Sequence, residues 1–163
     1  MTDFASFGLD PNILKAIGSL GFETPTPVQA KVIPLLLESS QDLVALAQTG
    51  TGKTAAFGLP LIHQVDTDSK AIQALILCPT RELCLQICRD LKQFTKHMPA
   101  VRTVAVYGGA PIYNQLKALE NGVHIVVGTP GRMHDILRRG KADFSKCRWT
   151  VLDEADEMLT MGF

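Results

Sequence analysis

Residues 47–54 read Ala-Gln-Thr-Gly-Thr-Gly-Lys-Thr and stand between an apolar run, Leu43–Leu46, and an apolar stretch compatible with a helix. This order predicts a buried strand, a loop and a helix, the setting of a phosphate-binding loop. The two glycines let the backbone turn so that successive N–H groups point at phosphate oxygens. Lys53 can then reach the outer phosphates, and the Thr54 hydroxyl can bind Mg²⁺. The alternative, a simple tight turn, leaves the Gly-Lys-Thr ending unexplained.

A pair of acids follows another short apolar run, Trp149–Leu152. Carboxylates at the end of a buried strand are costly to leave unpaired, and a metal ion with an attacking water accounts for both. Asp153 is then expected to hold Mg²⁺, and Glu154 to orient or deprotonate the water. The alternative is an exposed acidic start of a helix. Because Lys53 supplies the complementary phosphate site, we predict that Lys53, Asp153 and Glu154 are catalytic.

A glutamine offers a way to recognise the base. Thr26 can cap a helix that Pro27 starts, and Gln29 lies just inside that helix. A glutamine amide carries one donor and one acceptor group, which complement N6 and N7 of adenine, whereas guanine presents two acceptors. Without this context a helical glutamine is an ordinary solvated residue. Together with the phosphate loop, the sequence predicts that Gln29 selects adenine.

The remaining pattern alternates strands and helices. A helix is expected from Pro11, capped by Asp10, to a stop at Gly21, and the longest helix from Glu82 to about His97. Such alternation implies an α/β fold, a parallel sheet with helices on both faces, whose ligands lie beyond the carboxyl ends of the strands. The expected strands are Leu43–Leu46, Ala74–Cys78, Thr103–Val106, His124–Val127 and Trp149–Leu152.

Composition limits the function. The 163 residues are 46% hydrophobic, enough for one domain, and hold no apolar run long enough to span a membrane. The N-terminus lacks the pattern of a signal peptide, so a cytoplasmic protein without a membrane partner is expected. Zero net charge argues against a strong sequence-blind grip on nucleic acid, but permits a local patch. Arg138 and Arg139 fit such a patch and fit equally well as a complement to a helix dipole.

The four cysteines, at 78, 84, 88 and 147, lack the paired short spacings of a metal site. We therefore interpret them as buried structural thiols.

Taken together, the motifs resemble the first RecA-like domain of a DEAD-box RNA helicase. The Asp-Glu-Ala-Asp signature stands at 153–156, and the phosphate loop begins with the alanine that is usual in this family. The family's adenine-reading segment matches Gly21–Gln29, preceded by an isolated aromatic at Phe4. Further matches, in the family's order, are Pro79–Leu83, Gly108-Gly109 and Thr129–Arg132. The sequence most resembles the bacterial cold-shock group.

This resemblance implies a RecA-like P-loop NTPase fold over residues 1–163, with ATP and Mg²⁺ as cofactors and RNA as the substrate. Mg²⁺ contacts are implied for Thr54 and Asp153, partly through water, and an interdomain contact for Asp156. The implied nucleotide contacts are Phe4, Phe22, Thr24, Gln29, Gln48, Thr49, Gly50, Thr51, Gly52, Lys53 and Thr54. The implied contacts to the RNA backbone are Pro79, Thr80, Arg81, Gly108, Gly109, Thr129, Gly131 and Arg132.

The family also implies a partner within the same protein. A second RecA-like domain follows the first and supplies the arginines that stabilise the transition state, whereas this sequence ends before the family's Ser-Ala-Thr motif. The expectation is a chain that binds nucleotide, turns it over slowly, and belongs to an enzyme that unwinds RNA duplexes locally. Two alternatives stay open: another P-loop ATPase such as a DNA translocase, and a nucleotide-binding module without catalysis.

Overall fold

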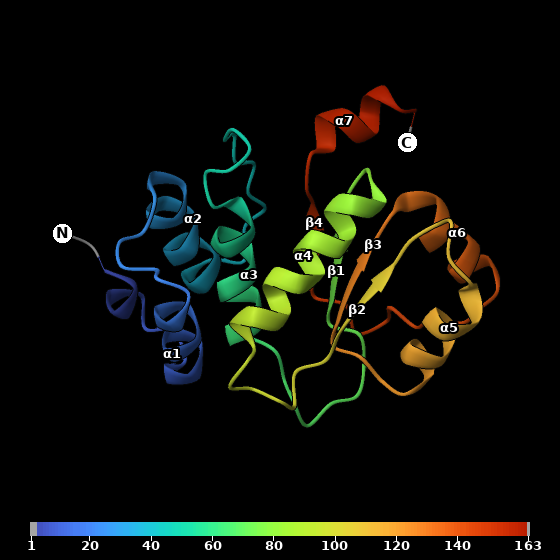
Figure 1. Ribbon diagram of the computed structural model, residues 1–163, viewed down its shortest axis with the longest axis horizontal. Coiled ribbons are helices and arrows are strands. Elements are labelled where there is room, and N and C mark those ends of the chain that lie inside the picture. The colour runs from blue at the N-terminus through green and yellow to red at the C-terminus, as the bar shows by residue number, and fades with distance from the viewer. Residues whose placement is uncertain (1–2, 163) are drawn as a thin grey trace. The chain divides into compact units, whose positions relative to one another are not determined.

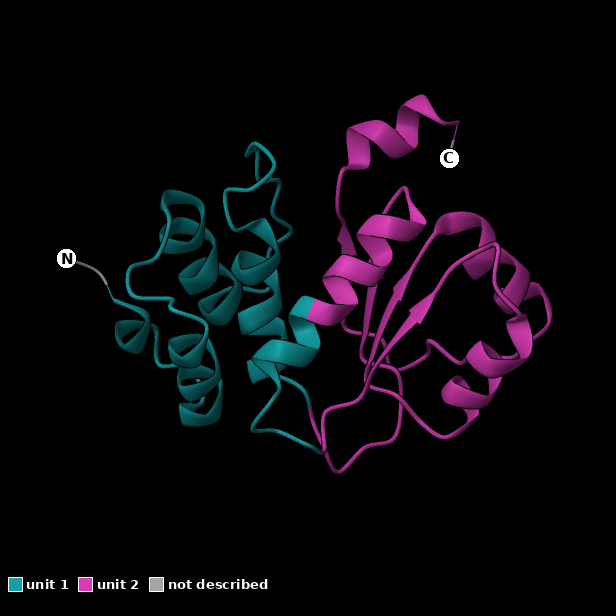
Figure 2. Ribbon diagram, in the orientation of Figure 1, with its two compact units in different colours: residues 1–65, 90–99 teal, residues 66–89, 100–163 magenta. Residues whose placement is uncertain are grey.

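The computed structural model describes residues 3–162. The chain forms two compact units, residues 1–65 with 90–99 and residues 66–89 with 100–163 (Figure 2). Helix α4 (Arg81–Phe94) contributes its first part to the second unit and its last part to the first. Among the described residues, no helix is long and apolar enough to cross a membrane.

The first unit is helical (Figure 1). It contains the 3₁₀ helix η1 (Phe4–Phe7) and the α-helices α1 (Pro11–Ser19), α2 (Pro27–Glu38) and α3 (Lys53–His63). The predicted helix starts are confirmed. The Asp10 carboxylate accepts the Asn12 N–H at 2.7 Å, and Thr26 forms a reciprocal capping box with Gln29.

An aromatic cluster ties the start of the chain to this unit. The Phe4 ring lies 5.9 Å from that of Phe22 and 6.1 Å from that of Phe7, centroid to centroid, and Phe22 lies 6.0 Å from Phe94. Such edge-on and tilted pairs add to the burial of apolar area. The cluster therefore fixes η1 and the segment before α2 to the end of α4.

The prediction of a buried strand at Leu43–Leu46 is wrong. This segment has no regular secondary structure, and its apolar side chains are exposed: 40% for Leu43, 87% for Val44 and 95% for Leu46. A strand needs a partner for its N–H and C=O groups, and no described segment pairs with these residues. A run of four apolar residues indicates hydrophobicity, but it does not show whether a neighbouring strand is present to pair with it. The pattern alone was therefore insufficient to predict a strand.

The second unit is built on a parallel four-stranded sheet in the order β2-β3-β1-β4. Two of the predicted strands, at 103–106 and 149–152, have the expected bounds. The strand predicted at 74–78 ends one residue earlier, and the strand predicted at 124–127 begins and ends one residue later. The strands are β1 (Ala74–Leu77), β2 (Thr103–Val106), β3 (Ile125–Gly128) and β4 (Trp149–Leu152). The helices are the first part of α4, α5 (Ile112–Glu120), α6 (Pro130–Arg138) and α7 (Ala155–Thr160).

Helices cover both faces of this sheet, as predicted. On one face Val106 and Val126 pack with Leu119 of α5 and with Ile136 of α6. On the other face Cys84 of α4 lies against the sheet, its Sγ 3.1 Å from the Val127 carbonyl oxygen. β3 is buried along its whole length, which explains its uninterrupted apolar sequence. The longest helix, α4, ends at Phe94 and so before the expected His97.

All four strands run in the same direction, so their carboxyl ends meet at one edge of the sheet. The segments that follow them are Pro79–Leu83 after β1, Gly108-Gly109 after β2, Thr129–Arg132 after β3 and Asp153–Asp156 after β4. This edge is where open α/β sheets bind their ligands.

Candidate functional site

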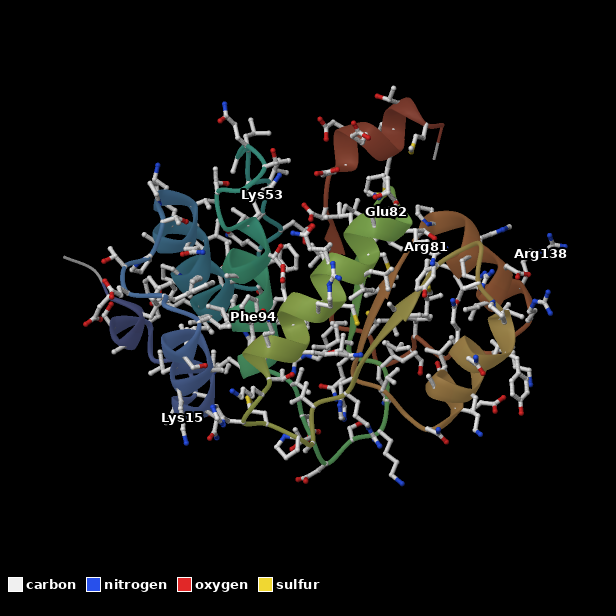
Figure 3. The ribbon with its side chains drawn as sticks, in the orientation of Figure 1. Lys15, Lys53, Arg81, Glu82, Phe94 and Arg138 are labelled. Carbon is white, nitrogen blue, oxygen red and sulfur yellow. The ribbon has the colours of Figure 1, made fainter. Side chains whose placement is uncertain are left out.

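The phosphate-loop candidate lies in the first unit. Gly50 and Gly52 have φ values of 78° and 87°, in the left-handed region that favours glycine. Gly52 is the N-cap of α3, and Lys53 and Thr54 form its first turn, half-exposed (Figure 3). The loop therefore places a lysine, a hydroxyl and the free N–H groups of a helix start together, which is the donor set of a phosphate site. Thr51 closes the loop by donating to the Gln48 carbonyl at 2.7 Å.

Gln29 is attached to this loop. Its Nε2 donates to the Gly52 carbonyl at 3.2 Å, while its Oε1 accepts the Thr26 N–H at 2.9 Å. A Cβ on Gly52 would overlap the Gln29 amide, so glycine is needed there for contact as well as for φ. By valence, these two bonds leave one amide hydrogen and one lone pair of Gln29 unused, and the reading of adenine by them stays a prediction. The side chain itself is only 3% exposed.

The other predicted base contacts are divided between buried and exposed positions. Phe4 is 5% exposed and belongs to the aromatic cluster with Phe22, which is half-buried, whereas Thr24 is exposed. The Phe4 ring is thus first of all a core residue of the first unit. Its stacking on adenine stays a prediction.

The two predicted catalytic carboxylates follow β4 in the second unit. Asp153 is 9% exposed, and its N–H donates to the Leu77 carbonyl at 2.9 Å, which continues the pairing of β4 with β1. Its Oδ1 accepts the Glu154 N–H at 3.1 Å. Glu154 has φ 53° and ψ 49°, and among the described residues it is the one residue other than glycine with positive φ. Backbone strain of this kind persists where the surrounding structure fixes it, and it clusters at functional sites.

Asp153 and Glu154 influence the pKa of a nearby thiol, that of Cys78. The pKa of Cys78 is raised, first by its hydrogen bond with Cys84, then by burial, and further by electrostatic interactions with Cys84, Asp153 and Glu154. Cys78 therefore stays a neutral thiol. Three of the cysteines, at 78, 84 and 88, are buried as predicted, while Cys147 is half-buried.

The candidate Mg²⁺ ligands are oxygen donors, which fits the preference of this ion. Within residues 3–162 there is no cluster of three or more His, Cys, Asp or Glu side chains that could hold a metal by itself. Thr54 belongs to the first unit and Asp153 to the second, and their binding of Mg²⁺ stays a prediction.

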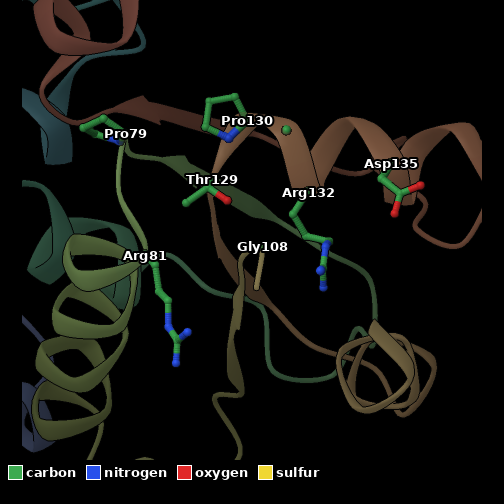
Figure 4. A pocket seen from close by; sticks show the side chains of 8 residues that line it. Pro79, Arg81, Gly108, Thr129, Pro130, Arg132 and Asp135 are labelled. Carbon is green, nitrogen blue, oxygen red and sulfur yellow. The ribbon is translucent and has the colours of Figure 1, made fainter. Parts of the chain in front are cut away.

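In the second unit an open cavity of ≈ 500 Å³ lies at the carboxyl edge of the sheet (Figure 4). The side chains of Arg81 and Arg132 extend toward it from the starts of α4 and α6, with Gly108 between them. Six of its eight lining residues are predicted RNA contacts. The lining consists of Pro79, Arg81, Gly108, Thr129, Pro130, Gly131, Arg132 and Asp135.

Both arginines are held in place. The Arg81 guanidinium carbon lies 5.0 Å from the centroid of the Tyr107 ring, a cation–π contact. Arg132 donates from Nη1 to Gln115 Oε1 and from Nη2 to the Ala110 carbonyl, both at 3.0 Å. Each guanidinium keeps further N–H groups for an anion, because arginine carries five.

Two threonines are further candidate donors: Thr129 lines the cavity, and Thr80 lies in sequence between the lining residues Pro79 and Arg81. The Thr80 hydroxyl accepts the Leu83 N–H at 3.2 Å at the start of α4, and its own hydrogen stays free to donate. Thr129 is the N-cap of α6 but makes no side-chain capping bond. The first N–H groups of α6 therefore lack a side-chain partner from the cap, and they point toward the cavity end of the helix.

Sequence reasoning missed several residues of this site. Tyr107, Gln115 and Asp135 shape the cavity or hold its arginines, yet none belongs to a motif quoted above. Tyr107 directly precedes the Gly108-Gly109 pair at the end of a predicted strand, so its sequence position could have indicated that it lies at the site. Gln115 lies mid-helix in α5 and offered none.

Comparison with known proteins identifies the class. The family model described as DEAD/DEAH box helicase matches residues 26–163. The chain belongs to this family.

Among curated relatives, the chain is 54% identical over 162 residues to the ATP-dependent RNA helicase DeaD of Escherichia coli strain K12. It is 52% identical over 165 residues to the ATP-dependent RNA helicase CshA of Listeria monocytogenes. These matches cover 99% and 100% of this chain, and 26% and 31% of the relatives. They confirm the resemblance to the bacterial cold-shock group. The chain spans about a quarter to a third of the length of these relatives.

The fold is confirmed in the same way. A crystal structure of a DEAD box protein from the hyperthermophile Methanococcus jannaschii is similar to this chain with a TM-score of 0.93 and 46% identity. The similarity covers 99% of this chain and 44% of that protein. The RecA-like α/β fold with a parallel sheet is thereby established.

Proposed function

We propose that this chain is the ATP-binding domain of an ATP-dependent RNA helicase that acts in the cytoplasm and couples ATP hydrolysis to local unwinding of RNA duplexes. The observation that carries the proposal is the cavity at the carboxyl edge of the sheet. In a member of the DEAD/DEAH box family, six residues from the predicted RNA motifs line that one cavity.

The nucleotide half of the function rests on the loop at the start of α3. Lys53 binds the outer phosphates as a point charge, and the Thr54 hydroxyl and the Asp153 carboxylate hold Mg²⁺. Glu154 orients the attacking water and takes its proton. When bound, Mg²⁺ supplies neutralisation of the phosphate charge.

RNA binding rests on Arg81, Arg132, the two threonine hydroxyls and the N–H groups at the start of α6. These groups are donors, so they suit phosphate and 2′-hydroxyl oxygens. Contacts to phosphates and 2′-hydroxyls carry no direct sequence information, so a weak sequence preference is expected. Asp135, the one acid of the lining, already pairs with Arg139 at 2.9 Å.

Catalysis requires a further component. Cationic stabilisation of the developing phosphoryl charge is worth about 10³–10⁵ in rate in comparable NTPases. We propose that a second RecA-like domain of a longer protein supplies it, with Asp156 at the contact. The relatives are about three to four times as long as this chain, which is consistent with a further domain.

Steady-state phosphate release by the 163-residue chain, with and without RNA, tests this proposal. We expect nucleotide binding, very slow turnover and no stimulation by RNA. Adding the second domain should restore turnover, and Glu154→Gln should abolish it while ATP binding persists. RNA-stimulated turnover by the chain alone would overturn the two-domain mechanism. Stimulation of the complete protein by DNA instead of RNA would favour a DNA translocase.

A further inference from the structure

The two arginines of the cavity are connected through a residue that does not line it. Gln115 of α5 is 7% exposed, and both ends of its amide are engaged. Its Oε1 accepts from Arg132 Nη1 at 3.0 Å, and its Nε2 donates to the Tyr107 carbonyl at 3.1 Å. The orientation of the amide is fixed by chemistry, because a guanidinium only donates and a carbonyl only accepts.

The hydrogen bond to Tyr107 is important because the side chain of Tyr107 contacts the other arginine of the cavity, Arg81. Its ring lies under the Arg81 guanidinium, and its carbonyl precedes Gly108 in the cavity wall. Gln115 therefore joins Arg132 to the same residue that supports Arg81. One buried amide fixes the relative positions of the two cationic groups.

We infer that Gln115 is a positioning residue for RNA binding, which holds Arg132 in the conformation that meets the RNA backbone. This inference rests on the proposed RNA function of the cavity. Arginine has several rotatable bonds, and ordering one such side chain on binding weakens affinity by about two- to tenfold. An arginine that is already held in the free protein avoids that cost.

No close relative of the glutamine side chain replaces it here. Glutamate would turn a carboxylate oxygen toward the Tyr107 carbonyl and would neutralise the Arg132 charge. Methionine keeps the length and the apolar packing but makes neither hydrogen bond. The two substitutions therefore separate the loss of positioning from the loss of charge.

The test measures the affinity of the 163-residue chain for a fluorescent single-stranded polyuridine RNA as a function of salt. Gln115→Met should weaken binding by about two- to tenfold and leave the salt slope nearly unchanged, because the charge of Arg132 stays. Gln115→Glu should weaken binding and lower the slope by up to about one unit. Arg132→Lys should lose about as much affinity as Gln115→Met, with the slope retained.

The decisive measurement is the double variant. If Gln115 acts through Arg132, Gln115→Met should cause no further loss in the Arg132→Lys or Arg132→Ala background. A merely structural role predicts the same additional loss in every background, and that result would overturn the inference. Arg132→Lys alters a half-exposed side chain, so this arm stays informative even where Gln115→Met destabilises the fold.

Gln73 provides a matched control. It is 5% exposed and also uses both ends of its amide, accepting the Asp66 N–H at 2.9 Å and donating to the Asp66 carbonyl at 2.7 Å. It precedes β1 and so lies at the opposite end of the strand from the cavity. Gln73→Met should lower stability about as much as Gln115→Met and leave RNA affinity unchanged.

The single variants distinguish a failure of the Gln115 role from a failure of the proposed RNA function of the cavity. If Arg132→Ala weakens RNA binding but Gln115→Met does not, the positioning role of Gln115 is refuted and the RNA function of the cavity stands. If Arg132→Ala leaves RNA affinity unchanged, the proposed RNA function of the cavity fails, and the inference fails with it.

Discussion

The Gln29 amide nitrogen donates to the Gly52 carbonyl at 3.2 Å, so the residue predicted to read the base is bonded to the loop predicted to hold the phosphates. The same side chain closes the capping box of α2. Gln29 thus has two structural tasks in addition to the proposed recognition of adenine. The effect of a substitution at Gln29 must therefore be compared with that of a control substitution that removes only the capping interaction of α2.

Gln29→Ala should abolish most of the preference for adenine over guanine nucleotides. The expected loss is about 1–3 kcal/mol for a bidentate contact, and calorimetry with ADP and GDP measures it. Thr26→Ala removes the capping hydroxyl but keeps the Gln29 amide, so it should lower stability by about 1 kcal/mol and keep the preference. Equal affinity of the unmutated chain for ADP and GDP would refute base reading by Gln29.

The phosphate loop makes a separate prediction. Lys53→Ala should weaken triphosphate binding and leave adenosine binding nearly unchanged, because adenosine has no phosphate for the ammonium group to meet. Thr54→Ala should mainly reduce the dependence of ATP binding on Mg²⁺. Titration calorimetry with and without Mg²⁺ measures both. Lys15→Ala, at an exposed position of α1, is the control for the loss of one positive charge.

Arg81 and Arg132 should contribute to RNA binding through charge. Each substitution to alanine is expected to weaken binding about equally for unrelated RNA sequences and to lower the salt slope by up to about one unit. Arg138, exposed in the last turn of α6 and absent from the cavity lining, separates its two interpretations. Arg138→Ala should leave the slope unchanged if it only complements the helix dipole, whereas a lower slope would extend the RNA surface to it. A loss that depends on RNA sequence at Arg81 or Arg132 would indicate base readout instead.

The pattern of the sequence was sufficient where a local rule decides the structure. Asp10 and Thr26 cap the helices that they were expected to cap, because a capping side chain bonds within its own first turn. The four strands of the second unit were recognisable because each is an apolar run between turn residues. Their carboxyl ends then placed the motifs at one edge of the sheet without further information.

The pattern failed where the structure depends on a distant partner. The apolar run Leu43–Leu46 has the same sequence pattern as the four strands. Strand pairing, however, depends on residues distant in the sequence, and in the structure Leu43, Val44 and Leu46 are exposed. Gln115 is the opposite case, a polar residue whose sequence position looks ordinary and whose role comes from Arg132 and Tyr107. Side chains that act through other side chains leave no periodicity to detect.

Glu154 offers a test of whether backbone strain has been retained for function. Its left-handed conformation costs a residue with a Cβ about 1 kcal/mol or more, and glycine is nearly free of this cost. Glu154→Gly should therefore raise the free energy of unfolding by about 1 kcal/mol, after allowing for the greater freedom of glycine in the unfolded chain. Glu154→Gln keeps the Cβ, so its stability should stay close to that of the unmutated chain.

Urea unfolding of the unmutated chain, Glu154→Gly and Glu154→Gln measures the difference in the free energy of unfolding. The slope of the free energy against urea concentration shows whether the unfolded state has changed. In the proposed two-domain enzyme both substitutions should abolish turnover, since neither glycine nor glutamine can take a proton from the attacking water. A residue that lowers stability and is needed for turnover is maintained by function. A glycine variant no more stable than the glutamine variant would show instead that the turn before α7 holds Glu154 without strain.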